Sequence, residues 1–266
     1  MSDDDTDDPA ERFATTAEQY AVYRPAYDDR AIEYLRERFA LDGTGRLLDL
    51  GCGTGRLGVA LAPHVGEIVG VDPNETMIEY ARERAAVVDA ENTDWRVGSD
   101  ADLPEMADEL APLRLTVMGR AFHWMDQERT LDTLYEICET GGGVALLSDT
   151  EWLARGTAEW QTAVYAVVDE YLDDPPERTG PVEYDDPWDE TLEAHGFTDA
   201  EERTFELDRE WDADGVVGYL LSLSFCSPAV LGDDREQFEA DVRAALQAYE
   251  QPYEEEAETS VVAGER

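Results

Sequence analysis

The chain has 266 residues, which allows one large domain or two small ones with a sizeable core. Hydrophobic residues make up 42% of it, so the composition is not that of a disordered chain. Its 64 Asp and Glu residues outnumber its 20 basic residues, all of them arginine, and the formal net charge is −44. A general basic surface for wrapping nucleic acid is therefore not expected.

The acidity indicates a protein adapted to high salt. Repulsion among like charges destabilises a compact state in dilute buffer, whereas in molar salt the Debye length falls to about 3 Å. We interpret the acidic, lysine-free composition as that of a halophilic protein from a salt-accumulating cytoplasm, the alternative being an ordinary acidic protein. The same screening weakens the exclusion of nucleic acid, because charge at a distance counts for little in brine.

Three further features bear on the compartment. Residues 1–12 are acidic and lack an apolar stretch, so we expect a disordered N-terminus and no signal peptide. The uncharged run 215–232 is interrupted by serines and a proline, which favours a buried helix and loop over a membrane span. Cys52, Cys138 and Cys226 are widely spaced and indicate neither a disulfide framework nor a metal site. We expect a cytoplasmic protein.

Short apolar runs alternate with helical segments between residues 46 and 149. The predicted strands, each bounded by turn residues, are 46–51, 67–72, 94–99, 113–119 and 143–149. Asn74 and Asp126 are candidate caps of two intervening helices, and Gly141 is the candidate end of the second helix. Strand and helix alternation of this kind predicts a parallel sheet covered on both faces.

The pattern changes after residue 149. The predicted elements are a helix at about 157–172, a proline-rich loop, a helix ending at Gly196, a strand at 203–211, helices at about 214–225 and 233–249, and a closing strand at 258–264. We interpret residues 13–266 as a single domain. Its expected parts are N-terminal lid helices at 13–45, a cofactor-binding core at 46–149, a cap at 150–250 and a closing strand at 251–266.

The sequence DLGCGTG, residues 49–55, follows the first strand and opens a helix, where free backbone amides meet polar ligands. Gly51, Gly53 and Gly55 let the main chain approach a ligand where any β-carbon would collide. Asp72 ends the second predicted strand and is placed for the hydroxyls of a ribose.

Two cofactors compete for this turn. GTGRLG, residues 53–58, spells the G-x-G-x-x-G of nicotinamide-binding folds, with Asp72 at a suitable distance along the chain. Asp49, however, is expected at the mouth of the site, where it would repel a pyrophosphate and attract the ammonium of a methionine moiety. The electrostatics favour S-adenosylmethionine, with a nicotinamide-dependent oxidoreductase as the alternative.

The motifs LLDLGCGTG, VGVDPNETMIEYARERA, VGSDADLP, RAFHWMD and GGGVALL, in this order, resemble the class I S-adenosylmethionine-dependent methyltransferases. The resemblance is to the small-molecule branch that includes trans-aconitate and related type-11 methyltransferases. The lead-in FATTAEQYAVYRPAY is also similar to that branch. The resemblance implies a Rossmann-like α/β fold, with a seven-stranded, mostly parallel sheet, helices on both faces and an antiparallel last strand.

The resemblance also implies roles for individual residues at the cofactor. Asp49, Gly51, Gly53 and Gly55 would surround its methionine end, and Asp72 would hold its ribose. The adenine would meet Met77, which is otherwise a core methionine. Its edge would meet Asp100 and Ala101, unless a shift of one residue puts Ser99 in the acidic place. Phe122 and Arg24 complete the expected cofactor-binding set.

His123 and Trp124 are the candidate catalytic residues, because they follow the fourth strand, where an open α/β sheet presents its ligand crevice. A carboxylate acceptor needs no base, whereas for a phenol, amine or carbon acid His123 would serve as one. Otherwise His123 only shapes the pocket. Arg24, with Tyr20, Tyr23 and Tyr27, is a candidate lid residue that pairs with a carboxylate, or else a surface ion-pair partner.

We therefore expect methyl transfer from S-adenosylmethionine to a small molecule, a carboxylate or hydroxyl, by in-line displacement. Neither a nucleic acid nor a membrane is an expected partner. A non-catalytic S-adenosylmethionine-binding regulator is the alternative of another class. Enzymes acting on exocyclic amines are not indicated, because MGRAFHW stands where they carry their Pro-Pro motif, and the DPPE string at 174–177 comes after the fifth strand.

The charge balance predicts salt-dependent folding. Because screening removes the self-repulsion of the acidic chain, far-UV circular dichroism is expected to show much more helix and strand in molar KCl than in dilute buffer. Titration of the protein with KCl measures this directly. Equal structure at both ends of the titration would contradict the halophilic interpretation.

Overall fold

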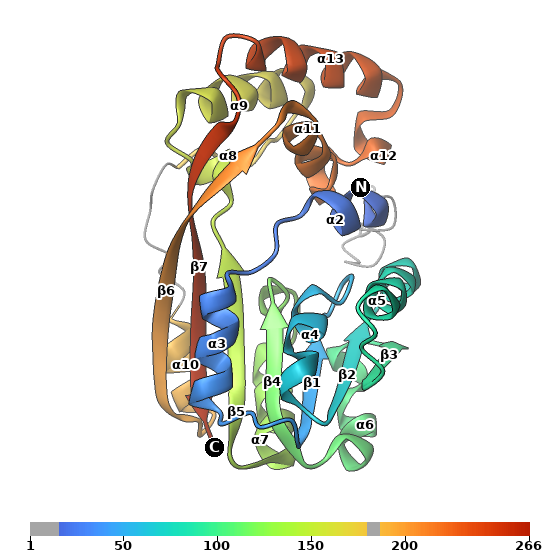
Figure 1. The fold of residues 1–266 in the computed structure, drawn as a ribbon, viewed down its shortest axis with the longest axis vertical. Helices are drawn as coiled ribbons and strands as arrows, with labels where there is room; N and C mark the ends of the chain where they lie inside the picture. Colours follow the sequence, from blue (N-terminus) through green and yellow to red (C-terminus); the bar gives the residue numbers. More distant parts are fainter. Residues whose placement is uncertain (1–15, 180–186) are drawn as a thin grey trace, which may run out of the picture. The chain divides into compact units, whose positions relative to one another are not determined.

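The computed structural model describes residues 16–179 and 187–266 (Figure 1). These residues divide into two compact units, and the single methyltransferase domain expected for residues 13–266 stays a prediction. The sheet unit comprises residues 26–149, 187–205 and 259–266. The cap unit comprises residues 16–25, 150–179 and 206–258. The predicted disordered N-terminus, 1–12, lies outside the described residues.

Seven strands form one sheet in the order β3-β2-β1-β4-β5-β7-β6. Their bounds are β1 Arg46–Leu50, β2 Glu67–Asp72, β3 Thr93–Val97, β4 Leu113–Gly119, β5 Cys138–Asp149, β6 Thr198–Trp211 and β7 Tyr253–Glu265. Strands β1 to β5 pair in parallel, and β7 pairs antiparallel to β5. The predicted fold class, with its antiparallel last strand, is confirmed.

Helices cover both faces of the parallel strands. Neighbouring residues of each strand point to opposite faces, and both faces carry apolar side chains that the helices bury. Leu47 of β1 packs with helices α3 and α4 and with α5, whereas Leu48 packs with α6, α7 and α10. The bounds are α3 Asp29–Arg38, α4 Arg56–Leu61, α5 Glu75–Val87, α6 Leu103–Leu110, α7 Gln127–Ile137 and α10 Trp188–Ala194. Single 3-10 turns are η1 Ala62–His64, η2 Asp100–Asp102 and η3 Phe122–Trp124.

The helix caps follow the prediction at two N-termini and differ at one C-terminus. Asn74 accepts the backbone N–H of Met77, and Asp126 accepts that of Arg129. The expectation that α7 ends at Gly141 is wrong, because the helix ends at Ile137. Cys138 already pairs with Leu113 of β4, so the chain is extended from that residue onward and Gly141 lies inside β5.

The cap unit is built around aromatic side chains. Its helices are α2 Ala17–Tyr23, α8 Trp152–Arg155, α9 Glu159–Tyr171, α11 Ala213–Leu221, α12 Pro228–Leu231 and α13 Arg235–Leu246, with 3-10 turns η4 Ser224–Cys226 and η5 Gly232–Asp234. Trp152 is 1% exposed and stacks on Tyr219, with ring centroids 5.1 Å apart. Trp160 and Trp211 belong to the same buried cluster. These aromatic residues therefore form a core.

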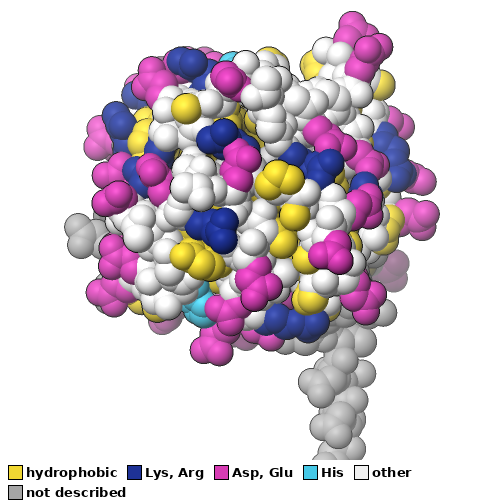
Figure 2. All heavy atoms as spheres, turned by 90° about the horizontal axis from the view of Figure 1, so that it is seen from below, with side chains coloured by type: hydrophobic (Ala, Val, Ile, Leu, Met, Phe, Trp, Pro, Cys, Tyr) yellow, Lys and Arg dark blue, Asp and Glu magenta, His cyan; other side chains and the backbone are white. Residues whose placement is uncertain are grey.

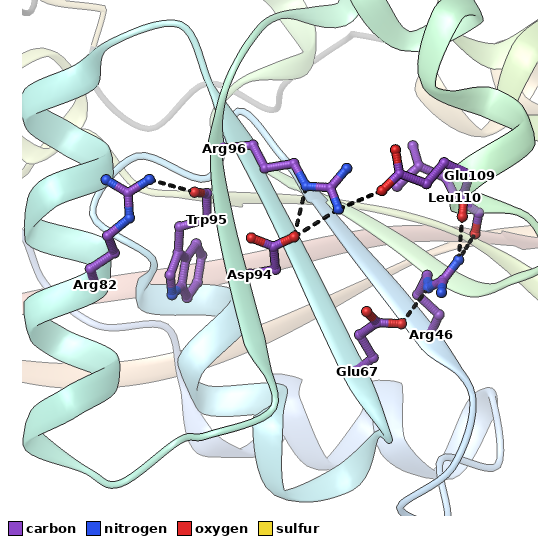
Figure 3. Close-up of polar contacts among 8 residues, drawn as sticks. All are labelled: Arg46, Glu67, Arg82, Asp94, Trp95, Arg96, Glu109 and Leu110. Atoms are coloured by element: carbon purple, nitrogen blue, oxygen red, sulfur yellow. Dashed lines mark hydrogen bonds and ion pairs between the residues drawn. The ribbon is translucent and has the colours of Figure 1, made fainter.

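Arginines fix the end of α6 against the sheet (Figure 3). Arg46 donates to the carbonyl oxygens of Glu109 and the next residue at 2.6 and 2.9 Å, and its Nε pairs with Glu67 at 2.6 Å. Arg96 joins Asp94 and Glu109 at 2.7 and 2.8 Å. The planar guanidinium suits such multiple contacts, which a lysine could not reproduce.

Acidic side chains are spread over the face seen in Figure 2, with arginines among them. Within the described residues, no single helix is long and apolar enough to cross a membrane. The segments Ala213–Leu221 and Ser224–Leu246 meet the length and composition criteria only together, as a pair bent by 104°.

Candidate active site

The glycine turn lies at the carboxyl end of β1, where its backbone must bend sharply. Gly51, Gly53 and Gly55 have φ values of 70°, 52° and 71°, in the left-handed region that favours glycine. A β-carbon on Gly51 would also overlap the side chain of Ala121, which follows β4. The turn thus packs directly against the segment after β4, and the two form one surface at the carboxyl edge of the sheet.

Asp72 holds this turn from the end of β2. Its Oδ2 accepts the N–H of Gly53 at 2.8 Å and its Oδ1 accepts that of Asn74 at 2.9 Å. Burial raises the pKa of Asp72, and the two N–H groups act against this rise. Each carboxylate oxygen keeps a second acceptor position, so a ribose hydroxyl can still donate to it. The ribose contact of Asp72 stays a prediction.

Asp49 is more deeply buried than the sequence suggested. It is 1% exposed instead of lying open at the mouth of the site, and its Oδ2 accepts the N–H of Gly58, in α4, at 2.8 Å. Burial raises its pKa to about 7, the Gly58 N–H opposes the rise, and the charge of Asp72 adds to it. A positively charged group bound nearby would favour the ionised form of this carboxyl group.

The expected adenine residues lie on two short segments. Met77 is 3% exposed in the first turn of α5. Asp100 accepts the N–H of Asp126 at 3.0 Å, which ties η2 to the start of α7. The N–H of Ala101 donates to Ser99 at 3.3 Å, so the Ser99 hydroxyl caps η2. The adenine contacts of Met77, Asp100 and Ala101 stay predictions.

The segment after β4 divides its aromatic residues between core and surface. Phe122 is 1% exposed and packs edge-on against Trp188 at 6.0 Å, so its observed contacts are those of a core residue. His123 and Trp124 are exposed, with ring centroids 5.0 Å apart. The structure therefore brings the two candidate catalytic side chains together on one surface turn.

Arg24 lies in the cap unit, and the structure describes its contacts there. Its guanidinium lies 5.2 Å from the ring of Tyr20 and 5.1 Å from that of Tyr219, and the residue is 8% exposed. Tyr23 packs against Gly218, where a β-carbon would overlap its ring. Arg24, Tyr20 and Tyr23 thus belong to the packing of α2 on α11, and the predicted cofactor contact of Arg24 stays a prediction.

A pocket of about 650 Å³ lies within the cap unit, and none of the predicted site residues lines it. Its walls carry the acidic residues Glu206, Asp208, Glu256 and Glu258 together with Arg155. Among the residues that the structure describes, no group of three or more His, Cys, Asp or Glu side chains could hold a metal ion.

The sequence analysis did not select Arg120, which follows β4, or Asp149, which is the last residue of β5. Arg120 has a φ of 56°, and its guanidinium pairs with Asp149 at 2.7 Å and lies 5.0 Å from the ring of Tyr27. Tyr27, a candidate lid residue with Tyr20 and Tyr23, lies in the sheet unit. The available signal was position, because both Arg120 and Asp149 stand where strands of the sheet end.

Comparisons with known proteins identify the enzyme class. Residues 47–142 match the model of a family described as a methyltransferase domain. An uncharacterised methyltransferase of Schizosaccharomyces pombe is 26% identical over 80% of this chain and 78% of its own length. An arsenite methyltransferase of Halobacterium salinarum is 32% identical over 71% of this chain and 47% of its own length.

The fold is also that of a solved methyltransferase. The structure of an S-adenosylmethionine-dependent methyltransferase from Thiobacillus denitrificans, in complex with S-adenosylhomocysteine, has a TM-score of 0.53 and 16% identity. The match covers 96% of this chain and 98% of that one. The methyltransferase domain matched at residues 47–142 contains the glycine turn, Asp72 and the segment after β4. The chain thus carries a methyltransferase domain and has the fold of a methyltransferase.

Proposed function

We propose that the enzyme transfers the methyl group to a small molecule, at a carboxylate or hydroxyl oxygen. The exposed pair His123 and Trp124 carries this proposal, because it follows Ala121, which touches the glycine turn at Gly51. An acceptor at this turn would therefore lie beside the reactive end of the cofactor. A net charge of −44 further supports a small molecule over a nucleic acid.

The residues at the glycine turn fit the donor. S-adenosylmethionine, when bound, supplies a methyl group on a positively charged sulfur, which becomes neutral as the carbon–sulfur bond breaks and the carbon–oxygen bond forms. Asp49 would pair with its ammonium, and Asp72 would accept from its ribose hydroxyls. The ring face of Trp124 favours a cation by about 0.5–2 kcal/mol. Orientation and exclusion of water contribute the rest.

The role of His123 depends on the acceptor. A carboxylate acceptor is already ionised near neutral pH and needs no proton removed. With a hydroxyl acceptor, His123 takes the hydroxyl proton as the new carbon–oxygen bond forms. The exposed position of His123 suits both cases, because either acceptor can approach it from solvent.

Arsenite is a poor candidate acceptor, although one relative is named for it. Trivalent arsenic is a soft ion of the kind that thiolates bind. Here Cys52, Cys138 and Cys226 are all buried. Burial raises the pKa of Cys52 well above its usual range and the pKa values of Cys138 and Cys226 to about 12. These thiols would stay protonated.

We further infer that the enzyme works in the cytoplasm of a halophile, as a member of the type-11, trans-aconitate-like branch. The lysine-free, acidic composition supports the halophilic origin, and so does the similarity to a Halobacterium salinarum protein. The three free cysteines support a reducing compartment. The quoted motifs support the branch.

An acceptor screen tests the proposed function. The enzyme is incubated in molar KCl with S-adenosylmethionine carrying a deuterated methyl group and a metabolite extract of a halophile, and products are sought by mass spectrometry. We expect labelled methyl esters or methyl ethers, together with S-adenosylhomocysteine. Binding of the donor without turnover would instead favour a non-catalytic regulator, and label recovered only in RNA would overturn the small-molecule acceptor.

The pairing of Asp49 with an ammonium predicts opposite effects of Asp49→Asn on stability and on binding. The carboxyl pKa is about 7 in the folded chain and about 3.9 unfolded, so stability is lost as pH rises through 7. At pH 8 the variant is expected to be more stable than wild type, by up to about 4 kcal/mol, and at pH 4 equally stable. Donor binding should weaken by at least about 2 kcal/mol.

Thermal melts and calorimetric titrations at several pH values measure these effects. Wild-type affinity for S-adenosylmethionine should rise with pH up to about 7, as Asp49 ionises, whereas the variant should show a flat profile. Glu79→Gln removes the same charge from an exposed position and serves as control. If Asp49→Asn binds S-adenosylmethionine as tightly as wild type does, the proposed contact between Asp49 and the ammonium group is contradicted.

His123→Ala distinguishes the two acceptor classes. We expect unchanged affinity for S-adenosylmethionine, because the ring lies on the exposed turn η3. Turnover should fall by about 10²–10⁴-fold with a hydroxyl acceptor and remain nearly unchanged with a carboxylate. Calorimetry and steady-state rates on the acceptor from the screen give both values, with His64→Ala as control. A loss of donor affinity equal to the loss of turnover would contradict this role.

A further inference from the structure

The Tyr27 hydroxyl lies at the carboxyl edge of the sheet, although the residue comes from the N-terminal segment. A β-carbon on Gly119, the last residue of β4, would overlap the Tyr27 hydroxyl oxygen. The same β-carbon would lie 3.4 Å from Leu57, in the first turn of α4. Tyr27 thus covers the end of β4 next to the helix that the glycine turn opens.

Arg120 holds the Tyr27 ring from the residue that follows β4. Its backbone N–H donates to Leu147 of β5 at 2.8 Å, and its guanidinium lies 5.0 Å from the centre of the Tyr27 ring. The residue has a left-handed φ of 56°, a conformation that non-glycine residues rarely adopt and that clusters at functional sites. This backbone turn directs the guanidinium back over the end of the sheet.

Asp149 in turn fixes Arg120. Its Oδ2 accepts from the guanidinium at 2.7 Å, and its Oδ1 accepts the hydroxyl of Thr259, in β7, at 2.6 Å. The Arg120 side chain is 14% exposed and that of Asp149 is 4% exposed. A pair so well buried is screened little by salt, so it can hold its geometry in brine. The pair carries no net charge, so it does not repel a cationic donor.

These contacts place a phenol oxygen at the carboxyl edge of the sheet. The carboxyl edge of an open α/β sheet is the ligand side. Tyr27 borders β4 there, and Ala121, two residues past Gly119, contacts Gly51 of the glycine turn. A methyl group on a sulfonium carries a partial positive charge, and an oxygen nearby can accept weak hydrogen bonds from its C–H groups.

We propose that Tyr27 is a further residue of the methyl-transfer site, with its hydroxyl oxygen against the methyl group of S-adenosylmethionine, and that Arg120 is the positioning residue that orients it. The proposal rests on the donor site proposed above. Tyr27 discriminates between the charged donor and its neutral product, S-adenosylhomocysteine, because only the donor has the polarised methyl group.

Calorimetric titration of Tyr27→Phe with both compounds tests the contact without knowledge of the acceptor. We expect affinity for S-adenosylmethionine to fall by about three- to tenfold and affinity for S-adenosylhomocysteine to stay within about twofold. Tyr34→Phe, which removes a hydroxyl that donates to Glu201 in the same unit, should leave both affinities unchanged. A loss shared equally by the two compounds, or no loss, would overturn the proposal.

Arg120→Asn tests the positioning role, because asparagine tolerates the left-handed backbone. It should shift the ratio of the two affinities as Tyr27→Phe does, and the double variant should add nothing further. Additive effects would overturn the role of Arg120. If Arg120→Asn melts early, Asp149→Asn, which removes the carboxylate that fixes the guanidinium, supplies the same comparison.

The outcomes separate this proposal from the proposed function. Wild type that binds both compounds but methylates no small molecule would refute the acceptor class and leave the Tyr27 measurement intact. Wild type that binds neither compound would overturn both. Only a changed ratio of the affinities for S-adenosylmethionine and S-adenosylhomocysteine in Tyr27→Phe supports the proposed role of Tyr27.

Discussion

The site depends on two carboxyl groups that the fold removes from water at the ends of neighbouring strands. Asp49 and Asp72 lie near the carboxyl ends of the neighbouring strands β1 and β2. Asp72 accepts the N–H of Gly53 in the glycine turn, and Asp49 accepts that of Gly58 in α4. Desolvation opposes their ionisation, and the N–H groups only partly offset it. A positively charged ligand bound nearby would therefore stabilise the ionised form of both carboxyl groups.

The rest of the sheet unit serves to hold that arrangement. Gly51 lets the segment after β4 touch the turn, which brings the exposed His123 and Trp124 near it. Arg46 and Arg96 anchor the end of α6. These arginines make several directed hydrogen bonds each, and such bonds survive in salt better than isolated charge pairs do. This use of arginine agrees with a chain that contains no lysine.

Much of the fold could be predicted from local patterns. Strand β4 matches its apolar run residue for residue, and Asn74 and Asp126 cap the helices expected of them. The end of α7 could not be predicted, because it is set by the pairing of Cys138 with Leu113, which lies 25 positions earlier in the chain. The division into two units likewise depends on contacts between segments far apart in sequence.

The site was predictable in its residue types but less so in its surroundings. The motif identified Asp49 and Asp72, whereas the burial of Asp49 under Gly58 depends on how α4 packs. Tyr27, Arg120 and Asp149 come from three separate segments, and only their positions, in the N-terminal lead-in and at the ends of strands, distinguish them in the sequence. Only the folded chain brings them together, so no spacing rule could have selected them.

Strands β6 and β7 each contribute residues to both units, since the boundaries fall inside them at 205/206 and 258/259. Neither unit can therefore be produced alone by cutting the chain at one point. A fragment that ended at Asp149 would lack β7, the neighbour of β5, and would leave the backbone of β5 as a bare edge open to self-association. Swapping the cap between related enzymes thus requires junctions within two adjacent strands, with the hydrogen-bond register preserved across both.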